Sequence, residues 1–171
     1  MTVLAWHFLY EGNKMRCGNV APADGEWLEY KGNIKLCVSG LHASVHPFDA
    51  LQHSPGPILC LVECDDIREQ ADDKFVCGRR RIIARMDASE MLIYYARMEA
   101  LNALRYAPFL KLDDVVYDWL NTGDESVRSA ARSAARSAAE SAARSAAWSA
   151  ARLESQQRFD DLVVECFSDF L

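Results

Sequence analysis

The sequence predicts an α+β protein: an N-terminal antiparallel-rich sheet with a short helix, then an all-helical C-terminal half that includes a long Ala-rich helix. Three observations predict this. Short apolar runs separated by turn residues fill residues 1–86, whereas apolar residues recur at helical spacing from residue 87. Residues 126–152 form a Ser-Ala-Ala-X repeat, whose composition favours a helix. We therefore expect an α+β domain over residues 1–86 and a helical region over residues 87–171. Whether the helices pack on the sheet as one body stays open.

Five runs in the first domain have the composition of β-strands. They cover residues 3–9, 26–30, 34–38, 57–62 and 75–86. Lys31-Gly-Asn33 is a tight-turn signal, so the second and third runs are expected to form a hairpin. The fourth run is almost continuously apolar, which indicates a central strand buried on both faces. Pro47, placed at a first helical position, predicts a short helix over residues 47–52.

Four helices are expected in the C-terminal half, over about residues 88–107, 112–121, 124–151 and 153–169. Asp87-Ala-Ser-Glu90 and Thr122-Gly-Asp-Glu125 fit capping boxes, with Asp124 as a rival N-cap for the second. Whether Leu153–Gln157 separates two helices or continues one stays open. The last helix carries a regular apolar stripe at Phe159, Leu162, Val163, Cys166, Phe167 and Phe170.

The Ser-Ala-Ala-X repeat is the least ordinary part of the chain. Its X positions hold Arg at 128, 132, 136, 144 and 152, Glu at 140 and Trp at 148. A helix turns about 100° per residue, so the X positions spiral about 240° around it from Arg128 to Arg152. The arginines therefore do not form one straight basic face. The repeat is either a solvated connector or a contact arm, and its candidate partner-binding residues are Arg132, Arg136, Arg144 and Trp148.

Composition excludes several classes of protein. Half of the 171 residues are hydrophobic, which is typical of a globular chain, and no apolar run is long enough to span a bilayer. The first residues lack the basic and small-residue signals of a signal peptide, so we expect a cytoplasmic protein. Six scattered cysteines show no zinc spacing and are expected to be free, buried thiols. We expect no metal and no cofactor.

Charge is segregated along the chain, whose net charge is −6. An acidic block that includes Asp65 and Asp66 runs from residue 63 to 73, and Arg79, Arg80 and Arg81 form a compact basic block. These blocks are either complementary surfaces for a partner or solvated strand edges and loops. We take them as candidate partner-binding residues. The overall acidity disfavours direct nucleic-acid binding, which stays an alternative through the arginines.

Three residues could carry chemistry: His7, His42 and Ser44. His42 and Ser44 lie in Gly40-Leu-His-Ala-Ser44, a turn that could expose them at a strand end. A nucleophile and its base need mutual hydrogen bonding, which spacing cannot establish. The chain has no G-x-S-x-G elbow, P-loop or H-E-x-x-H motif. Structural roles for both histidines therefore stay open beside a catalytic one.

Several motifs resemble an uncharacterised domain found in bacteriophage and prophage proteins. They are Trp6-His-Phe-Leu9, Cys37-x-Ser-Gly-Leu-His-Ala-Ser44, Asp49-Ala-Leu51, Pro55-Gly56, Val62-Glu63, Asp73-Lys74 and the Arg79–Arg81 strand. The resemblance covers about residues 4–85, and the Ser-Ala-Ala-Arg tail is similar to tails on such phage proteins. It implies no established activity. It does imply an accessory protein that acts by binding and disabling a host machine, such as a CRISPR complex.

A second resemblance is to ADP-ribosyltransferase folds, through His7, Gly40–Ser44 and Ala50–His53. It implies an NAD-using enzyme, but His42 stands where those folds usually have an aromatic residue. The leading expectation is a non-enzymatic protein that binds a host protein or ribonucleoprotein complex in the host cytoplasm. The C-terminal helices are the expected site of self-association, and no membrane contact is expected.

Overall fold

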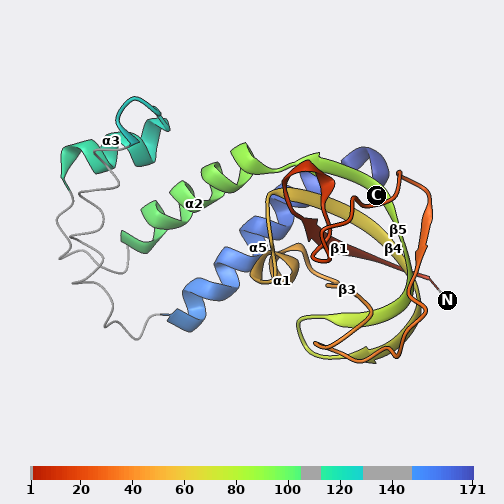
Figure 1. The fold of residues 1–171 in the computed structure, drawn as a ribbon. Coiled ribbons are helices and arrows are strands. Elements are labelled where there is room, and N and C mark those ends of the chain that lie inside the picture. The colour runs from red at the N-terminus through yellow and green to blue at the C-terminus, as the bar shows by residue number, and fades with distance from the viewer. Residues whose placement is uncertain (1, 105–112, 129–147) are drawn as a thin grey trace. The chain divides into compact units, whose positions relative to one another are not determined.

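The computed structural model describes residues 2–104, 113–128 and 148–171, with residues 148–152 described as backbone only (Figure 1). The chain divides into two compact units. The first, here called the sheet unit, comprises residues 1–89 and 158–171. The second, the helical unit, comprises residues 90–157. The fold is α+β, as predicted.

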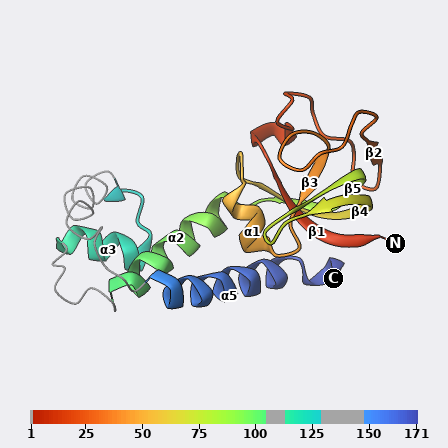
Figure 2. The ribbon, with the colours of Figure 1, turned by 90° about the horizontal axis from the view of Figure 1, so that it is seen from below.

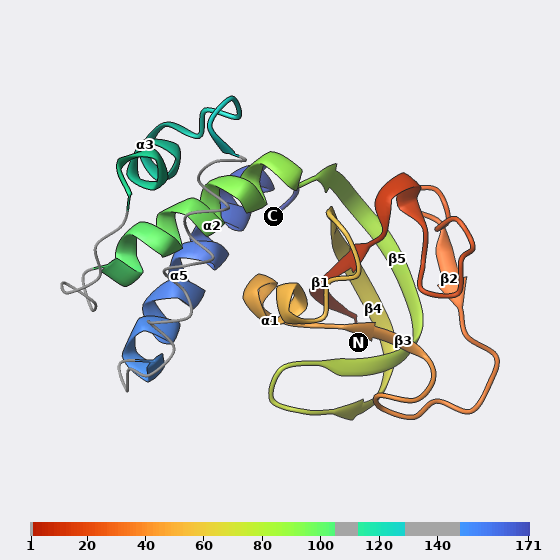
Figure 3. The same ribbon diagram turned by 60° about the vertical axis from the view of Figure 1, so that its left-hand side comes forward.

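The sheet unit is built on one antiparallel sheet of five strands. The strands are β1 (Val3–Leu9), β2 (Trp27–Glu29), β3 (Leu41–Ala43), β4 (Ile58–Gln70) and β5 (Phe75–Asp87). Their order is β1-β4-β5-β2, and β3 pairs with β5 beside β2 (Figure 3). Strands β4 and β5 are 13 residues each, so they form one long hairpin to which the shorter strands attach.

The sheet curls until β3 meets β1. A single bridge joins them, in which Trp6 and Ser44 exchange backbone hydrogen bonds of 2.8 and 3.0 Å. Residues on alternate positions of each strand then face one enclosed interior. That interior holds a cluster of small and apolar side chains: Ala5, Leu9, Ala21, Ala43, Ile58, Cys60, Val62, Cys64, Phe75, Cys77 and Ile82. We call this enclosed side the interior of the sheet, and the opposite side its outer face.

The outer face is covered at β1 by α1 (Pro47–Gln52) and by the last turns of α5 (Trp148–Cys166) (Figure 2). The Trp6 and Phe167 rings meet edge-on at 5.1 Å. The Asp160 carboxylate accepts the Phe48 backbone N–H at 2.8 Å, so α5 supplies the cap for the first turn of α1. Two short 3-10 turns, Glu11–Asn13 and Ser168–Phe170, complete this unit.

The helical unit contains most of α2 (Ser89–Leu104), α3 (Asp114–Thr122) and the first part of α5. Val116 and Leu120 form the buried face of α3. The Arg97 guanidinium of α2 donates a 3.0 Å hydrogen bond to the Leu120 carbonyl, which satisfies one of the open carbonyls at the end of α3. The described helices include none with both the length and the apolar character that crossing a membrane requires.

Strands 3–9 and 75–86 and helix 47–52 are confirmed, to within a residue. The predicted strand 34–38 is wrong, because that segment forms a turn closed by the Lys35–Ser39 bridge, with Cys37 at φ +63°. The predicted hairpin across residues 31–33 is wrong for the same reason. Strand β2 pairs with β5 instead, because the long β5 edge accepts β2 and β3 in turn.

The C-terminal half matches the prediction in part. Described residues at 89–104 and 114–122 are helical as expected, and α5 runs through Leu153–Gln157 without a break. Thr122 ends α3 and is not an N-cap; Asp124 instead accepts the Ser126 N–H at 2.8 Å. Residues 158–171 belong to the sheet unit, so this half is not one separate helical body. Most of the predicted helix 124–151 lies outside the described residues.

Candidate functional site

Three consecutive arginines on β5 alternate between the two sides of the sheet. Successive side chains of a strand point to opposite faces, so Arg79 and Arg81 share one side and Arg80 takes the other. Side chains of Arg79 and Arg81 are 41% and 36% exposed, whereas Arg80 is 6% exposed. The same charge is thus placed in two contrasting environments within three residues.

On the outer face, the two exposed arginines cover one tryptophan. The Arg79 and Arg81 guanidinium carbons lie 4.6 and 5.0 Å from the centre of the Trp27 ring. Strand β2 places Trp27 there, because its backbone pairs with Arg81 in the β2–β5 register. Cations over an indole face are attracted by its quadrupole.

Carboxylates pair with both of these arginines. Arg79 lies 3.3 Å from both Glu29 and Asp65, and the Arg81 Nε donates to Glu63 at 2.6 Å. We name the set the Trp27 face; it consists of Trp27, Glu29, Glu63, Asp65, Arg79 and Arg81. The acidic and basic blocks of the sequence are therefore cross-strand neighbours on β4 and β5, which hold each other in place.

Hydrogen bonds from Thr2 and Arg81 lower the pKa of the Glu63 carboxyl below its usual range. Asp66, a further candidate, departs from this arrangement. It has φ +58° at an irregular part of β4, and its carboxylate pairs with Arg68 at 2.8 Å. Asp66 therefore lies outside the Trp27 face.

Inside the sheet, Arg80 and His7 meet at one backbone carbonyl. The Arg80 Nη1 donates to the His42 carbonyl at 2.5 Å, and the His7 ring hydrogen-bonds to the same residue's backbone. Burial lowers the pKa of the His7 imidazole well below its usual range, and the Arg80 charge lowers it further. His7 is therefore neutral near pH 7. These contacts of Arg80 and His7 with the His42 backbone connect β5, β3 and β1 near the Trp6–Ser44 bridge.

Arg80 has unusual neighbours for a buried cation. Its neighbours include the thiols of Cys64, Cys77 and Cys60, and burial lowers the pKa of its guanidinium. Among the described residues, no carboxylate lies within ion-pair distance of Arg80. The sequence predicts Arg80 on a partner surface, but the structure places it in the interior, on the same side of β5 as Ile82.

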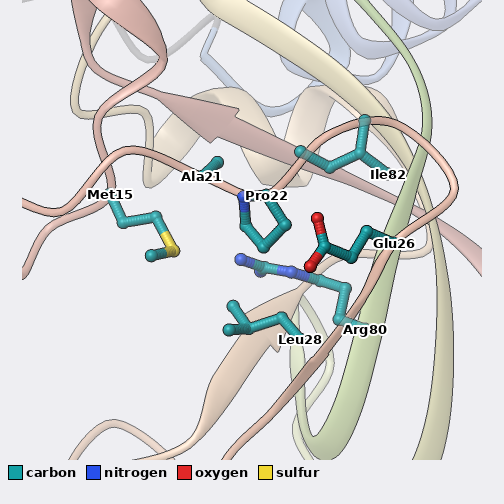
Figure 4. Close-up of a pocket in the computed structure, with 7 residues that line it drawn as sticks. All are labelled: Met15, Ala21, Pro22, Glu26, Leu28, Arg80 and Ile82. Atoms are coloured by element: carbon teal, nitrogen blue, oxygen red, sulfur yellow. The ribbon is translucent and has the colours of Figure 1, made fainter.

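A small hollow lies beside the Arg80 side chain. It measures about 10 Å³ and is lined by Met15, Ala21, Pro22, Glu26, Leu28, Arg80 and Ile82 (Figure 4). The Arg80 guanidinium extends between Pro22 and Leu28, and the carboxylate of the exposed Glu26 is drawn beside the Arg80 side chain. A hollow of this size has room for about one water molecule.

The structure does not bring the His42 ring to Ser44 as a base to a nucleophile. The His42 Nε2 accepts the Cys37 backbone N–H at 3.0 Å, and burial lowers the pKa of this ring. Ser44 is 2% exposed and shares its backbone bridge with Trp6. His42 faces away from His7, since Leu41 and Ala43 occupy the interior positions of β3. These contacts support the structural roles that the sequence left open.

Other predicted site residues fall outside what the structure describes. Arg132, Arg136 and Arg144 lie in residues 129–147, and Trp148 begins α5 with its side chain undescribed. Trp27 is the residue that sequence reasoning missed. Its signal was the run Glu26-Trp-Leu-Glu29, in which a tryptophan stands between two carboxylates in a short strand-like segment. Within the described ranges, no three His, Cys, Asp or Glu side chains gather to hold a metal ion.

One family model matches the chain. It is described as a domain of unknown function, DUF7666, and it matches residues 8–94, just over half of the 171 residues. The chain belongs to the DUF7666 family. No curated protein and no solved structure matches it. The DUF7666 segment contains α1, β2 to β5, the whole Trp27 face and Arg80, so both sides of the β4–β5 hairpin belong to the family domain.

Proposed function

We propose that this DUF7666 protein is a binding protein without catalytic activity, and that the Trp27 face is its contact surface for another protein. One observation carries the proposal: a tryptophan flanked by two arginines is held on an exposed strand face. Trp and Arg are the residues most enriched among the energetic centres of protein interfaces. The neighbouring carboxylates fix both guanidinium groups, which reduces the side-chain entropy that binding would cost.

The competing interpretation is a solvated ladder of ion pairs. Exposed ion pairs contribute little to stability. If these pairs were only structural, replacing any one of their residues would change the free energy of unfolding only slightly. A binding face would behave differently, because loss of its central anchor would abolish association while the fold stays intact. A binding measurement, rather than a stability measurement, therefore distinguishes the two interpretations.

The test uses the full chain as bait in a bacterial lysate. We expect the wild-type protein to recover one partner in stoichiometric amount, and Trp27→Ala to lose it at least tenfold. Tyr117→Ala, a partly exposed aromatic residue of the helical unit, is the matched control and should retain the partner. Recovery of no stoichiometric partner by the wild type, or equal recovery by Trp27→Ala, would count against the proposal.

A more specific proposal follows from the resemblance to phage and prophage domains. In it, the partner is a host protein or ribonucleoprotein complex in the bacterial cytoplasm, and the protein inhibits a defence complex such as a CRISPR effector. The mixed charge of the Trp27 face supports a protein partner over direct nucleic-acid contact, because its arginines are already paired with carboxylates. Self-association through the C-terminal helices is a separate proposal, tested by sedimentation.

A further inference from the structure

Strand β2 ends the strand order β1-β4-β5-β2, so only one of its two edges is paired within the sheet. Just beyond β2, the Tyr30 N–H donates to the Gly78 carbonyl of β5 at 2.9 Å. Backbone groups along an antiparallel strand face its two sides alternately, so the N–H and C=O of Leu28 also face β5. Those of Trp27 and Glu29 therefore face the other edge of β2.

This second edge of β2 is open within the part of the chain that the structure describes. The outward N–H and C=O groups of Trp27 and Glu29 make no hydrogen bond to a described residue. No residue from Pro22 to His42 is buried, so the segment that contains β2 is accessible along its length. An edge with unpaired backbone donors and acceptors is a template on which a further strand can pair.

The side chains of β2 determine what an added strand would carry. Every strand pair of this sheet is antiparallel, so an added antiparallel strand would meet Glu29, Leu28 and Trp27 in that order. The Glu29 side chain is 54% exposed, which favours a basic residue opposite it. Leu28 favours an apolar residue on the inner side, and the Trp27 ring favours an aromatic or β-branched residue on the outer side.

We propose that the open edge of β2 binds an extended segment of the partner protein as a sixth strand, antiparallel to β2, whose successive residues are basic, apolar and aromatic or β-branched. This rests on the proposed function, because it specifies how the partner reaches the Trp27 face. In this mode of recognition, backbone hydrogen bonds supply affinity and the alternate side chains supply specificity. Trp27 contributes to both, through its outward backbone groups and through its ring.

The first test titrates the full chain with the synthetic peptide acetyl-Thr-Lys-Val-Tyr-Thr-amide, whose Lys, Val and Tyr would lie opposite Glu29, Leu28 and Trp27. In nitrogen-edited NMR spectra, we expect the amide signals of Trp27 and Glu29 to shift saturably. N-methylation of the peptide's Tyr removes a donor to the Trp27 carbonyl and should weaken binding at least about fivefold. N-methylation of its Val is the matched control, because that N–H faces away from β2.

A second test changes the protein. Glu29→Pro removes the outward N–H of residue 29, whereas Glu29→Ala removes the same side chain and keeps the N–H. Proline is tolerated in an edge strand where its nitrogen faces solvent, so both variants should fold. We expect Glu29→Pro to bind the peptide, and the partner recovered by the wild type, at least about fivefold more weakly than Glu29→Ala does.

The added strand is overturned if the peptide shifts neither amide signal, if the two N-methylated peptides bind equally, or if Glu29→Pro binds as well as Glu29→Ala. Loss of the recovered partner in Trp27→Ala, with equal recovery by the two Glu29 variants, would keep the proposed function and discard the added strand. Full recovery by Trp27→Ala would discard the proposed function itself. Wild-type dimers that Glu29→Pro dissociates would assign the edge to a second copy of the chain instead.

Discussion

Arg79 and Arg81 on one side of β5, and Arg80 on the other, carry the same charge in opposite surroundings. The outer pair lies over Trp27, with carboxylates at 2.5 to 3.3 Å, and remains partly exposed. Arg80 is buried, bonds a carbonyl and has thiols for neighbours. An ion pair in water adds little to stability, whereas a buried cation constrains everything around it. The outer side is thus suited to association and the inner side to holding the fold.

The largest expected difference between the two sides is in stability. Arg80→Ala leaves a cavity and removes a hydrogen bond to the partly buried His42 carbonyl, so the free energy of unfolding should fall by about 2–4 kcal/mol. Arg79→Ala should lower it by about 1 kcal/mol or less. Urea unfolding of the two variants checks this. Equal losses would mean that Arg80 has no structural role beyond that of its neighbours.

Thiol reactivity reports how closed the interior is. Cys17, Cys37 and Cys166 are exposed, whereas Cys60, Cys64 and Cys77 are buried. We expect iodoacetamide to modify the buried thiols of the native protein on the order of 100-fold more slowly, because they react only after local opening. Arg80→Ala should speed their reaction more than Arg79→Ala does. Mass spectrometry of the labelled peptides gives the rates, and labelling of Cys77 as fast as Cys37 would contradict a closed interior.

A smaller expected effect is the pH dependence of the stability that Glu63 contributes on the outer side. The folded-state pKa of Glu63 is lowered, so its contribution to stability is present above the unfolded pKa of about 4.3. That contribution is lost as the pH falls through the lower folded-state pKa. The wild type should therefore exceed Glu63→Gln in urea midpoint at pH 6 and lose the advantage towards pH 3. A constant difference across this range would show that Glu63 acts by packing alone.

The smallest expected effect is that of salt. Partly exposed pairs such as Arg79–Asp65 are screened at high ionic strength, and buried groups are screened much less. The stability lost in Arg79→Ala should shrink between low salt and 0.5 M sodium gluconate, whereas the loss in Arg80→Ala should persist. If the stability losses of the two variants changed equally with salt, the two sides of β5 would not differ in how strongly their charges are screened.

Local patterns were sufficient for much of this fold. Val3–Leu9, the helix that begins at Pro47 and the apolar stripe through Phe159, Val163 and Phe167 follow from composition and period, and these three stripe residues are fully or almost fully buried. The segment 34–38 has strand composition, but it folds as a turn that the Lys35–Ser39 bridge closes. Strands β2 and β3 each pair with β5, which is long enough for both. No local pattern in the sequence indicates this pairing.

The site was less predictable than the fold. The basic and acidic blocks were visible, but their mutual pairing depends on the β4–β5 register, which sets Asp65 opposite Arg79 and Glu63 opposite Arg81. The strand period predicts that the middle arginine lies on the opposite side from the other two, and it does not say which side is the interior. His42 looked available for chemistry, but its ring nitrogen is engaged by the Cys37 N–H, a contact within an irregular turn.

Of the three arginines, Arg80 alone is enclosed by the sheet. Nitrogen-edited NMR of the arginine side chains tests it most directly, because exchange of guanidinium protons with water reports burial and hydrogen bonding residue by residue. We predict one guanidinium signal that exchanges at least about tenfold more slowly than those of Arg79 and Arg81, and that disappears in Arg80→Lys. Equally fast exchange of all three guanidinium groups would mean that Arg80 is not enclosed.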